Sequence, residues 1–302
     1  MTGGPTERRA VPDLGRVGLW TAALDALDVA AARDAVAQLD EQGWGALWFG
    51  EAYGREAFTA AALHLAASER LVVATGIASI YGRDAVAANA AARTLHEAHP
   101  GRFLLGLGVS HAPLVERMRG HTYGRPVQAM SEYLDALDAA PYVVAGDPGP
   151  PGRVLAALGP RMLELARDRA DGAHPYLVTP EHTASARALL GDGPVLAVEQ
   201  AVVLGEDVDE WRRRAHWHLE IYTGLPNYRA SWVRQGFGEQ DFGRGGSERL
   251  KQALVPRGLA AAVDRVREHL EAGATHVCLQ ALGADAFTVP TQDWAELAAA
   301  LL

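Results

Sequence analysis

The sequence predicts a (β/α)8 barrel, and three observations carry this prediction. Short apolar, β-rich runs alternate with longer alanine-rich runs of helical period, which is the pattern of a parallel sheet with crossover helices. Eight strands can be counted, and eight strand–helix units close naturally into a barrel. The turn after the first strand reads LWTAALDALD and has no glycine, whereas a doubly wound dinucleotide fold would carry a glycine fingerprint there.

The expected elements follow one another along the whole chain. The strands are short and apolar, and in chain order they cover 16–20, 46–50, 71–77, 102–108, 153–158, 173–178, 195–204 and 275–282. Helical patterns follow most of them, at 29–42, 57–68, 84–98, 127–139, 161–170, 181–190, 207–222 and 292–302.

The interval between the seventh and eighth strands is too long for a simple unit. This interval contains a helical pattern at 259–272 and, before it, a segment at about 224–257. We expect that segment to be a helical insertion over the C-terminal face of the barrel. We expect the chain, 1–302, to form a single domain. Four aromatic side chains either line a pocket or fix the insertion to the barrel, and these are Tyr222, Tyr228, Trp232 and Phe237.

Composition excludes several classes of partner. The net charge of -9 and the lack of a basic stripe with interleaved aromatics argue against nucleic acid. Cys278, the only cysteine, lies in the apolar run HVCLQAL, so a disulfide framework is excluded and a reducing compartment is favoured. Because neither a signal-peptide core nor an apolar run of about 18 residues occurs, we expect a cytoplasmic protein without a membrane partner.

Metal and hydrolase motifs fail on spacing. His96 and His99 are three residues apart rather than four, and His216 and His218 point to different faces of a predicted helix. We therefore expect no metal site. A GxSxG elbow is absent, so a serine hydrolase has no support.

In a barrel of this kind, functional residues gather at the C-terminal ends of the strands. Those ends combine glycines with polar and aromatic residues, which suits a flat ligand that the backbone approaches closely. The residues are Trp20, Thr21, Gly50, Glu51, Gly76, Ile77, Ser79, Ser110, His111, Tyr176 and Thr179. Gly159, Pro160 and Arg161 begin a predicted helix, where free N–H groups and a guanidinium can bind a phosphate; an ordinary turn would read the same way.

Several segments together resemble the bacterial luciferase-like oxidoreductase superfamily, in its branch that uses the 8-hydroxy-5-deazaflavin coenzyme (coenzyme F420). They read EQGWGALWFGEAYGREAFTAAA, ERLVVATGIASI, HPGRFLLGLGVSH and LGPRMLELARDRADGAHPYLVTPEHT, and the resemblance extends through LPNY and AGATHVCLQAL. Each motif is weak by itself, but the resemblance covers nearly the whole chain.

The resemblance implies a site at the barrel mouth. A non-proline cis peptide in the third strand would back the central ring of the coenzyme, and the matching bond here joins Gly76 to Ile77. The ring would lie near Trp20, Glu51 and Ser110, and the phosphate tail would reach Gly159, Pro160 and Arg161. The family resemblance also implies a homodimer.

The chain departs from the sugar-phosphate dehydrogenases of this superfamily, which show an Asp-His pair after strand two and a glutamate after strand four. Gly50-Glu51 and His111 stand at those places, so sugar-phosphate oxidation is disfavoured. We expect hydride transfer between coenzyme F420 and a small organic substrate, with His111 first and Glu51 second for the proton. For both residues, hydrogen bonding to loop backbone is the alternative. The alternative functions are an FMN-dependent monooxygenase supplied by a reductase, and a non-catalytic flavin-binding barrel.

Overall fold

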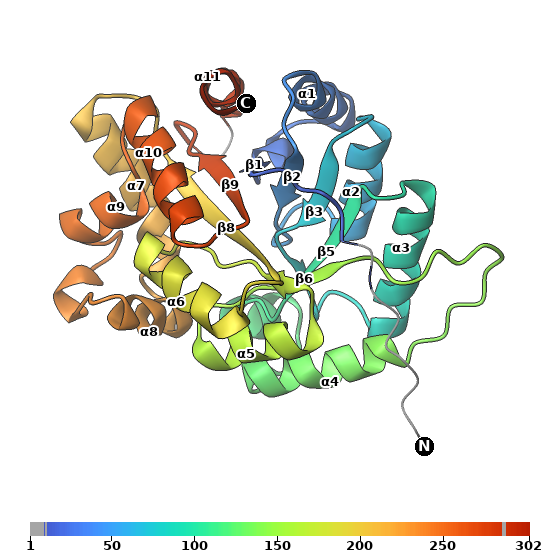
Figure 1. The fold of residues 1–302 in the computed structure, drawn as a ribbon. Coiled ribbons are helices and arrows are strands. Elements are labelled where there is room, and N and C mark those ends of the chain that lie inside the picture. Colours follow the sequence, from blue (N-terminus) through green and yellow to red (C-terminus); the bar gives the residue numbers. More distant parts are fainter. Residues whose placement is uncertain (1–8, 10, 286–287) are drawn as a thin grey trace.

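The strands close into a parallel eight-stranded barrel, which confirms the predicted fold class (Figure 1). The computed structural model describes Arg9 and residues 11–285 and 288–302. The strands are β1 (Val17–Trp20), β2 (Ala46–Phe49), β3 (Val72–Thr75), β4 (Ala78–Ser79), β5 (Phe103–Gly108), β6 (Arg153–Leu155), β7 (Gly172–Ala173), β8 (Val195–Val202) and β9 (His276–Ala281). β3 and β4 together form the third strand, and both pair with β5, so the sheet has no free edge there.

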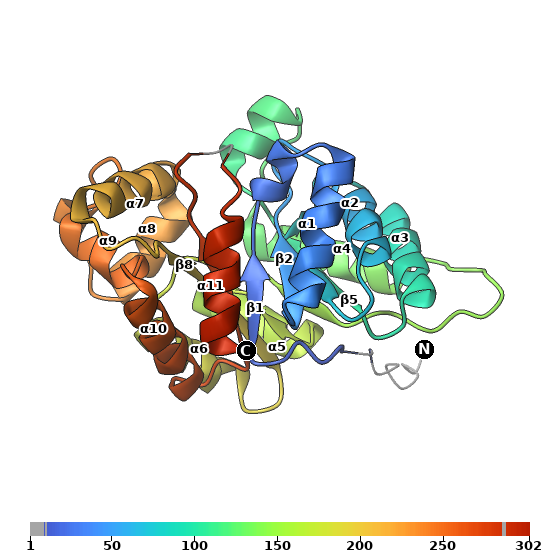
Figure 2. The same ribbon diagram turned by 90° about the horizontal axis from the view of Figure 1, so that it is seen from above.

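The helices lie outside the strands and cover them, as expected for crossover connections (Figure 2). They are α1 (Val29–Glu41), α2 (Ala57–Ala66), α3 (Ala85–Ala98), α4 (Pro126–Asp138), α5 (Pro160–Arg169), α6 (Pro180–Leu190), α7 (Val208–Tyr222), α8 (Pro226–Arg234), α9 (Glu248–Leu254), α10 (Leu259–Glu271) and α11 (Thr291–Leu301). Short turns lie at Ala23–Ala26, Leu114–Met118 and Glu239–Asp241. Asp28 and Asp84 begin α1 and α3 by accepting hydrogen bonds from first-turn N–H groups.

Side chains alternate between the barrel interior and the helix layer along each strand. On β8, Ala197 belongs to the interior cluster while Val198 packs in the outer core. The interior is unusually polar at its centre. Trp48 donates from Nε1 to Nε2 of His276 at 3.0 Å, and the Trp48 ring stacks on His174 with centroids 4.5 Å apart.

The strand expected at 153–158 is shorter in the structure, because β6 ends at Leu155, and two further strands are shortened or interrupted. The strand expected at 173–178 is reduced to β7 because Pro175 has no N–H to donate and Leu177 adopts a left-handed φ of 54°. The strand expected at 71–77 breaks after Thr75, where the Gly76–Ile77 peptide is cis. Both changes occur at the C-terminal ends of strands, and they determine where backbone groups point in the site.

The segment between α7 and α10 contains α8, the short turn and α9, which pack on a second hydrophobic cluster. Trp232 is fully buried and donates from Nε1 to the carbonyl oxygen of Leu177 at 3.0 Å. Gln235 accepts a hydrogen bond from the N–H of Thr179 at 3.0 Å. These contacts join α8 to the segment that follows β7.

No helix in the described part of the chain is long and apolar enough to cross a membrane.

Candidate functional site

The peptide between Gly76 and Ile77 is cis, as the family resemblance implies. Trp20 donates from Nε1 to the carbonyl oxygen of Gly76 at 3.0 Å, and the carbonyl oxygen of Ile77 accepts from the N–H of Glu51 at 3.1 Å. Within 71–80, only Gly76 and Ile77 are partly exposed, and the other residues are buried. Gly76 and Ile77, which we call the bulge, are therefore the part of the third strand that a ligand can reach.

The packing around Gly76 leaves no room for a side chain. A Cβ on Gly76 would lie 2.7 Å from Nε1 of Trp20 and 2.9 Å from Nε2 of His174. Nδ1 of His174 is 2.9 Å from the carbonyl oxygen of Ala197, whereas Nε2 is buried without a partner among the described residues. Because burial lowers the pKa of His174 to about 4, the ring is neutral at pH 7 and presents an acceptor nitrogen beneath the bulge.

Glu51 holds the bulge from the other side. Its Oε2 accepts from the N–H of Ser79 at 2.8 Å, and its Oε1 forms an ion pair with Arg83. The side chain is only 5% exposed. Glu51 is thus bound to the backbone and to a cation in this structure, as expected for a residue that positions the loop.

Ser110 and His111 follow β5 at the barrel mouth. Ser110 has a left-handed φ of 55°, and its carbonyl oxygen accepts a hydrogen bond from the hydroxyl of Tyr123 at 3.3 Å. The half-buried His111 ring faces Tyr228, with ring centroids 5.7 Å apart. Burial lowers the pKa of His111, so its imidazole is neutral at pH 7.

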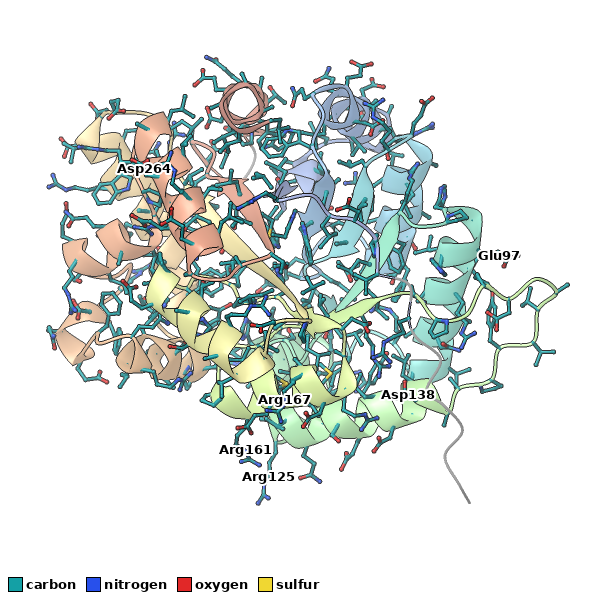
Figure 3. All side chains as sticks on the ribbon, in the orientation of Figure 1. Glu97, Arg125, Asp138, Arg161, Arg167 and Asp264 are labelled. Atoms are coloured by element: carbon teal, nitrogen blue, oxygen red, sulfur yellow. The ribbon has the colours of Figure 1, made fainter. Side chains whose placement is uncertain are left out.

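The start of α5 is open and has a cation beside it. Pro160, the first helical residue, has no N–H, and the N–H groups of Met162 and Leu163 donate to the carbonyl oxygen of Gly159 at 3.1 Å, so the N–H of Arg161 is the first-turn donor left for a phosphate. A Cβ on Gly159 would contact only the guanidinium of Arg234, at 3.6 Å, and that guanidinium also donates to the carbonyl oxygen of Leu158 at 3.1 Å. Arg161 is exposed, and Figure 3 shows it projecting outward from the ribbon.

Sequence reasoning missed Arg234. It stands in the segment 224–257, and only the fold brings α8 against the start of α5. Nothing in the local pattern LPNYRASWVRQ distinguishes it from the other surface arginines.

The aromatic residues near the insertion divide between two roles. Trp232 and Phe237 are buried in the cluster under α8 and α9, which is a packing role. Tyr222 and Tyr228 form an edge-to-face pair with ring centroids 4.8 Å apart, and Tyr222 also approaches Tyr176 at 5.5 Å. Tyr176 in turn contacts Trp20 at 5.3 Å, so one aromatic cluster runs from the bulge to His111.

The residues present fit a flat ring with a phosphorylated tail. Trp20 and the unpartnered nitrogen of His174 lie behind the partly exposed Gly76–Ile77 peptide. At the start of α5, the guanidinium of Arg234 from α8 lies beside Gly159. Trp20, Gly76, Ile77 and Ser110 lie at strand ends or directly after them, whereas Gly159, Pro160 and Arg161 begin a helix.

The chain belongs to the luciferase-like monooxygenase family, whose model matches residues 13–282. It is therefore an oxidoreductase of the luciferase-like class, which depends on a flavin or on coenzyme F420. A Mycobacterium tuberculosis protein named "Putative coenzyme F420-dependent oxidoreductase" is 31% identical over 102 residues, which span 34% of this chain and 29% of that protein.

Solved structures show the same fold at low identity. An F420-dependent secondary alcohol dehydrogenase, in complex with an F420-acetone adduct, superposes with a TM-score of 0.75 at 12% identity, covering 95% of this chain and 98% of that one. The oxygenating constituent of 3,6-diketocamphane monooxygenase from Pseudomonas putida, in complex with FMN, gives 0.67 at 12% identity, covering 94% and 96%.

Proposed function

We propose that this protein is an oxidoreductase that binds coenzyme F420 at the barrel mouth and exchanges a hydride with a small organic substrate. The observation that carries the proposal is the partly exposed backbone of Gly76 and Ile77, which Trp20 holds by a hydrogen bond and where Trp20 and His174 leave no room for a Cβ on Gly76. A flat ring can pack directly against this backbone, because Gly76 has no side chain to block it.

In this proposal, Trp20, Gly76, Ile77 and Ser110 surround the ring. Gly159, Pro160 and Arg161 provide the start of α5 for the phosphate, and Arg234 adds a cation beside Gly159. When bound, the deazaflavin supplies two-electron hydride chemistry with little reactivity toward oxygen. The chain itself aligns the substrate and exchanges one proton.

His111 is the first candidate for that proton. It is neutral at pH 7, lies half-buried at the mouth and faces Tyr228. Glu51 is the second candidate, although it would have to give up its contact with Arg83 or with the Ser79 N–H to act on a substrate. The geometry therefore favours His111 for proton exchange and Glu51 for positioning.

Both cofactors have support among the relatives. The M. tuberculosis protein and the alcohol dehydrogenase are named for coenzyme F420, whereas the diketocamphane monooxygenase was solved with FMN. The FMN-dependent monooxygenase is therefore the second candidate function.

Spectral titration of the purified protein separates the candidates. We expect tight binding of coenzyme F420 and weak binding of FMN. The reverse order would favour the monooxygenase, and binding of coenzyme F420 without turnover on a broad panel of alcohols and carbonyl compounds would favour a non-catalytic binding protein. If neither cofactor binds at micromolar concentration, the proposal fails.

We also propose a homodimer, as the family resemblance implies. Light scattering would then give twice the 32.1 kDa mass of one chain. A monomeric mass at micromolar concentration would contradict it.

A further inference from the structure

Glu199 is a buried carboxyl group that the site described above does not use. It lies on β8, two residues after the interior residue Ala197, and it is aligned with the interior residue Cys278 on β9. Alternation along the strand therefore turns its side chain into the barrel. The residue is 0% exposed, and it is the one ionisable residue of β8, in which Gln200 is the other polar residue.

The carboxyl group of Glu199 is only half satisfied. Its Oε2 accepts one hydrogen bond, from the N–H of Leu177 at 3.0 Å, and the left-handed φ of Leu177 is part of the geometry that turns this N–H inward. Oε1 has no hydrogen-bond partner within the described part of the chain. An ionised carboxylate in such a place would be very unfavourable, whereas a neutral carboxylic acid needs fewer partners.

Asp40 shows what a buried, ionised carboxylate requires in the same protein. Its two oxygens accept from the backbone N–H groups of residues 69–71 at 2.8–3.1 Å. Burial by itself raises the pKa of Asp40, but these hydrogen bonds lower it overall. Glu199 has one such bond, and burial raises its pKa to about 8, so it is protonated at pH 7.

The groups that face Glu199 are neutral as well. Its charge, when present, raises the pKa values of four titratable neighbours, which come from the segment after β7, from α7, from α8 and from β9: Tyr176, Tyr222, Tyr228 and Cys278. Within the described residues, no neighbouring cation lowers the pKa of Glu199. The N–H of Leu177 is the one group among the described residues that favours the ionised form, and burial outweighs it.

The three tyrosines near Glu199 also belong to the aromatic cluster at the mouth. The hydroxyl of Tyr222 donates to that of Tyr176 at 3.4 Å, and Tyr176 donates to Oε1 of Gln280 at 2.6 Å. Tyr222 packs on Tyr228, and Tyr228 faces His111. The aromatic cluster thus lies next to both the buried acid and the candidate proton-transfer residue, and ordered water would complete a hydrogen-bonded path between them.

We propose that the buried carboxyl group of Glu199 is the proton reservoir of the reaction: it stores the proton that a carbonyl substrate takes up when it is reduced. This inference rests on the proposed function. The reduced deazaflavin would give up the hydride and be oxidised by two electrons; the hydride adds to the carbonyl carbon, the π electron pair of the carbonyl moves to oxygen, and that oxygen takes one proton. The proton comes from the Glu199 carboxyl and passes through bound water to His111, which accepts on one ring nitrogen while releasing from the other. Glu199 becomes a carboxylate and regains a proton from solvent.

The first test needs neither cofactor nor substrate. Infrared spectra of the protein at pH 7, with and without ¹³C-glutamate labelling, report the carbonyl stretch of a protonated carboxylic acid. We expect this band in the wild type and its loss in Glu199→Gln. Asp293, whose pKa burial also raises, provides the matched control, because Asp293→Asn should leave the labelled glutamate band unchanged. A glutamate band that survives in Glu199→Gln would overturn the proposal.

The second test uses the enzyme loaded with reduced coenzyme F420. The rate of carbonyl reduction should fall as the pH rises through about 8, as Glu199 loses its proton. Glu199→Gln should reduce this rate at least 10-fold and abolish its fall above about pH 8. Glu199→Asp should restore part of the rate. An unchanged rate and pH profile in Glu199→Gln would overturn the proposal even if the infrared band is lost. If the band behaves as expected but coenzyme F420 does not bind, the proposed function fails and the reservoir role falls with it, while the protonation of Glu199 stands.

Discussion

The indole Nε1 of Trp20 donates to the carbonyl oxygen of Gly76 at 3.0 Å, and this bond joins the first strand of the barrel to the cis peptide of the third. The two residues are 56 positions apart in the chain. Their contact fixes the orientation of the bulge, which forms the floor of the proposed cofactor site. Two consequences can be tested, one for packing and one for binding.

Gly76→Ala should weaken both the fold and the site. The new methyl group would lie 2.7 Å from Nε1 of Trp20 and 2.9 Å from Nε2 of His174, and overpacking of this kind costs about 1–3 kcal/mol. We expect a lower urea midpoint and cofactor binding weakened at least 10-fold. Gly205→Ala is the matched control, because a Cβ there meets nothing within 4 Å. Equal effects of the two substitutions would contradict the packing argument.

His111→Ala should separate binding from chemistry. Loss of a positioned acid–base group reduces turnover by about 100-fold or more, whereas the coenzyme should bind with nearly unchanged affinity. Steady-state kinetics and spectral titration measure the two effects. His216→Ala, at an exposed position on α7, provides the control. An unchanged turnover number would remove His111 from proton transfer.

Arg234→Ala should weaken cofactor binding more than Arg161→Ala does. Both residues are exposed, but the guanidinium of Arg234 lies beside Gly159, whereas Arg161 projects outward (Figure 3). Loss of one charged hydrogen bond costs about 1.5–3 kcal/mol, which corresponds to a roughly 10- to 100-fold higher Kd. Fluorescence titration of both variants checks this order, and a larger effect at Arg161 would reverse the assignment.

Glu199 should make the stability of the protein fall with rising pH. Its pKa is raised from 4.5 to about 8, so between these values the folded state holds a proton that the unfolded state has lost. Raising the pH therefore favours unfolding, and the loss is complete above about pH 8. Between pH 7 and pH 9 the wild type should lose about 1 kcal/mol relative to Glu199→Gln, as measured by urea unfolding. A pH dependence that is the same in both proteins would show that Glu199 does not titrate in this range.

The sequence predicts the barrel well because its signals are local. Apolar runs such as 46–50 and 102–108 form strands near the expected bounds, since each run is bounded by turn residues and must be buried. The strand at 173–178 is predicted too long. There Pro175 and the left-handed Leu177 end the pairing early, and a pattern of apolar residues does not register either effect.

The candidate site could be predicted only in part. Trp20, Gly76, Ser110 and His111 stand at or just after strand ends, and the barrel geometry places such residues at the mouth. Arg234 and Glu199 were not singled out, because one depends on how α8 docks and the other on which face of β8 turns inward beside Leu177. Their importance arises from contacts between segments far apart in the chain.

The sequence by itself determined the class of fold, the order of the strands and helices and the family resemblance, because periodicity and turn residues are properties of neighbouring positions. Only the tertiary structure decided the protonation states and the ion-pair and hydrogen-bond partners of the ionisable groups. It ties Glu51 to Arg83, makes His111 and His174 neutral, and buries Glu199 with one hydrogen-bond donor. The reason is physical: a pKa depends on burial, on nearby charges and on hydrogen bonds, and these are set by packing between distant segments.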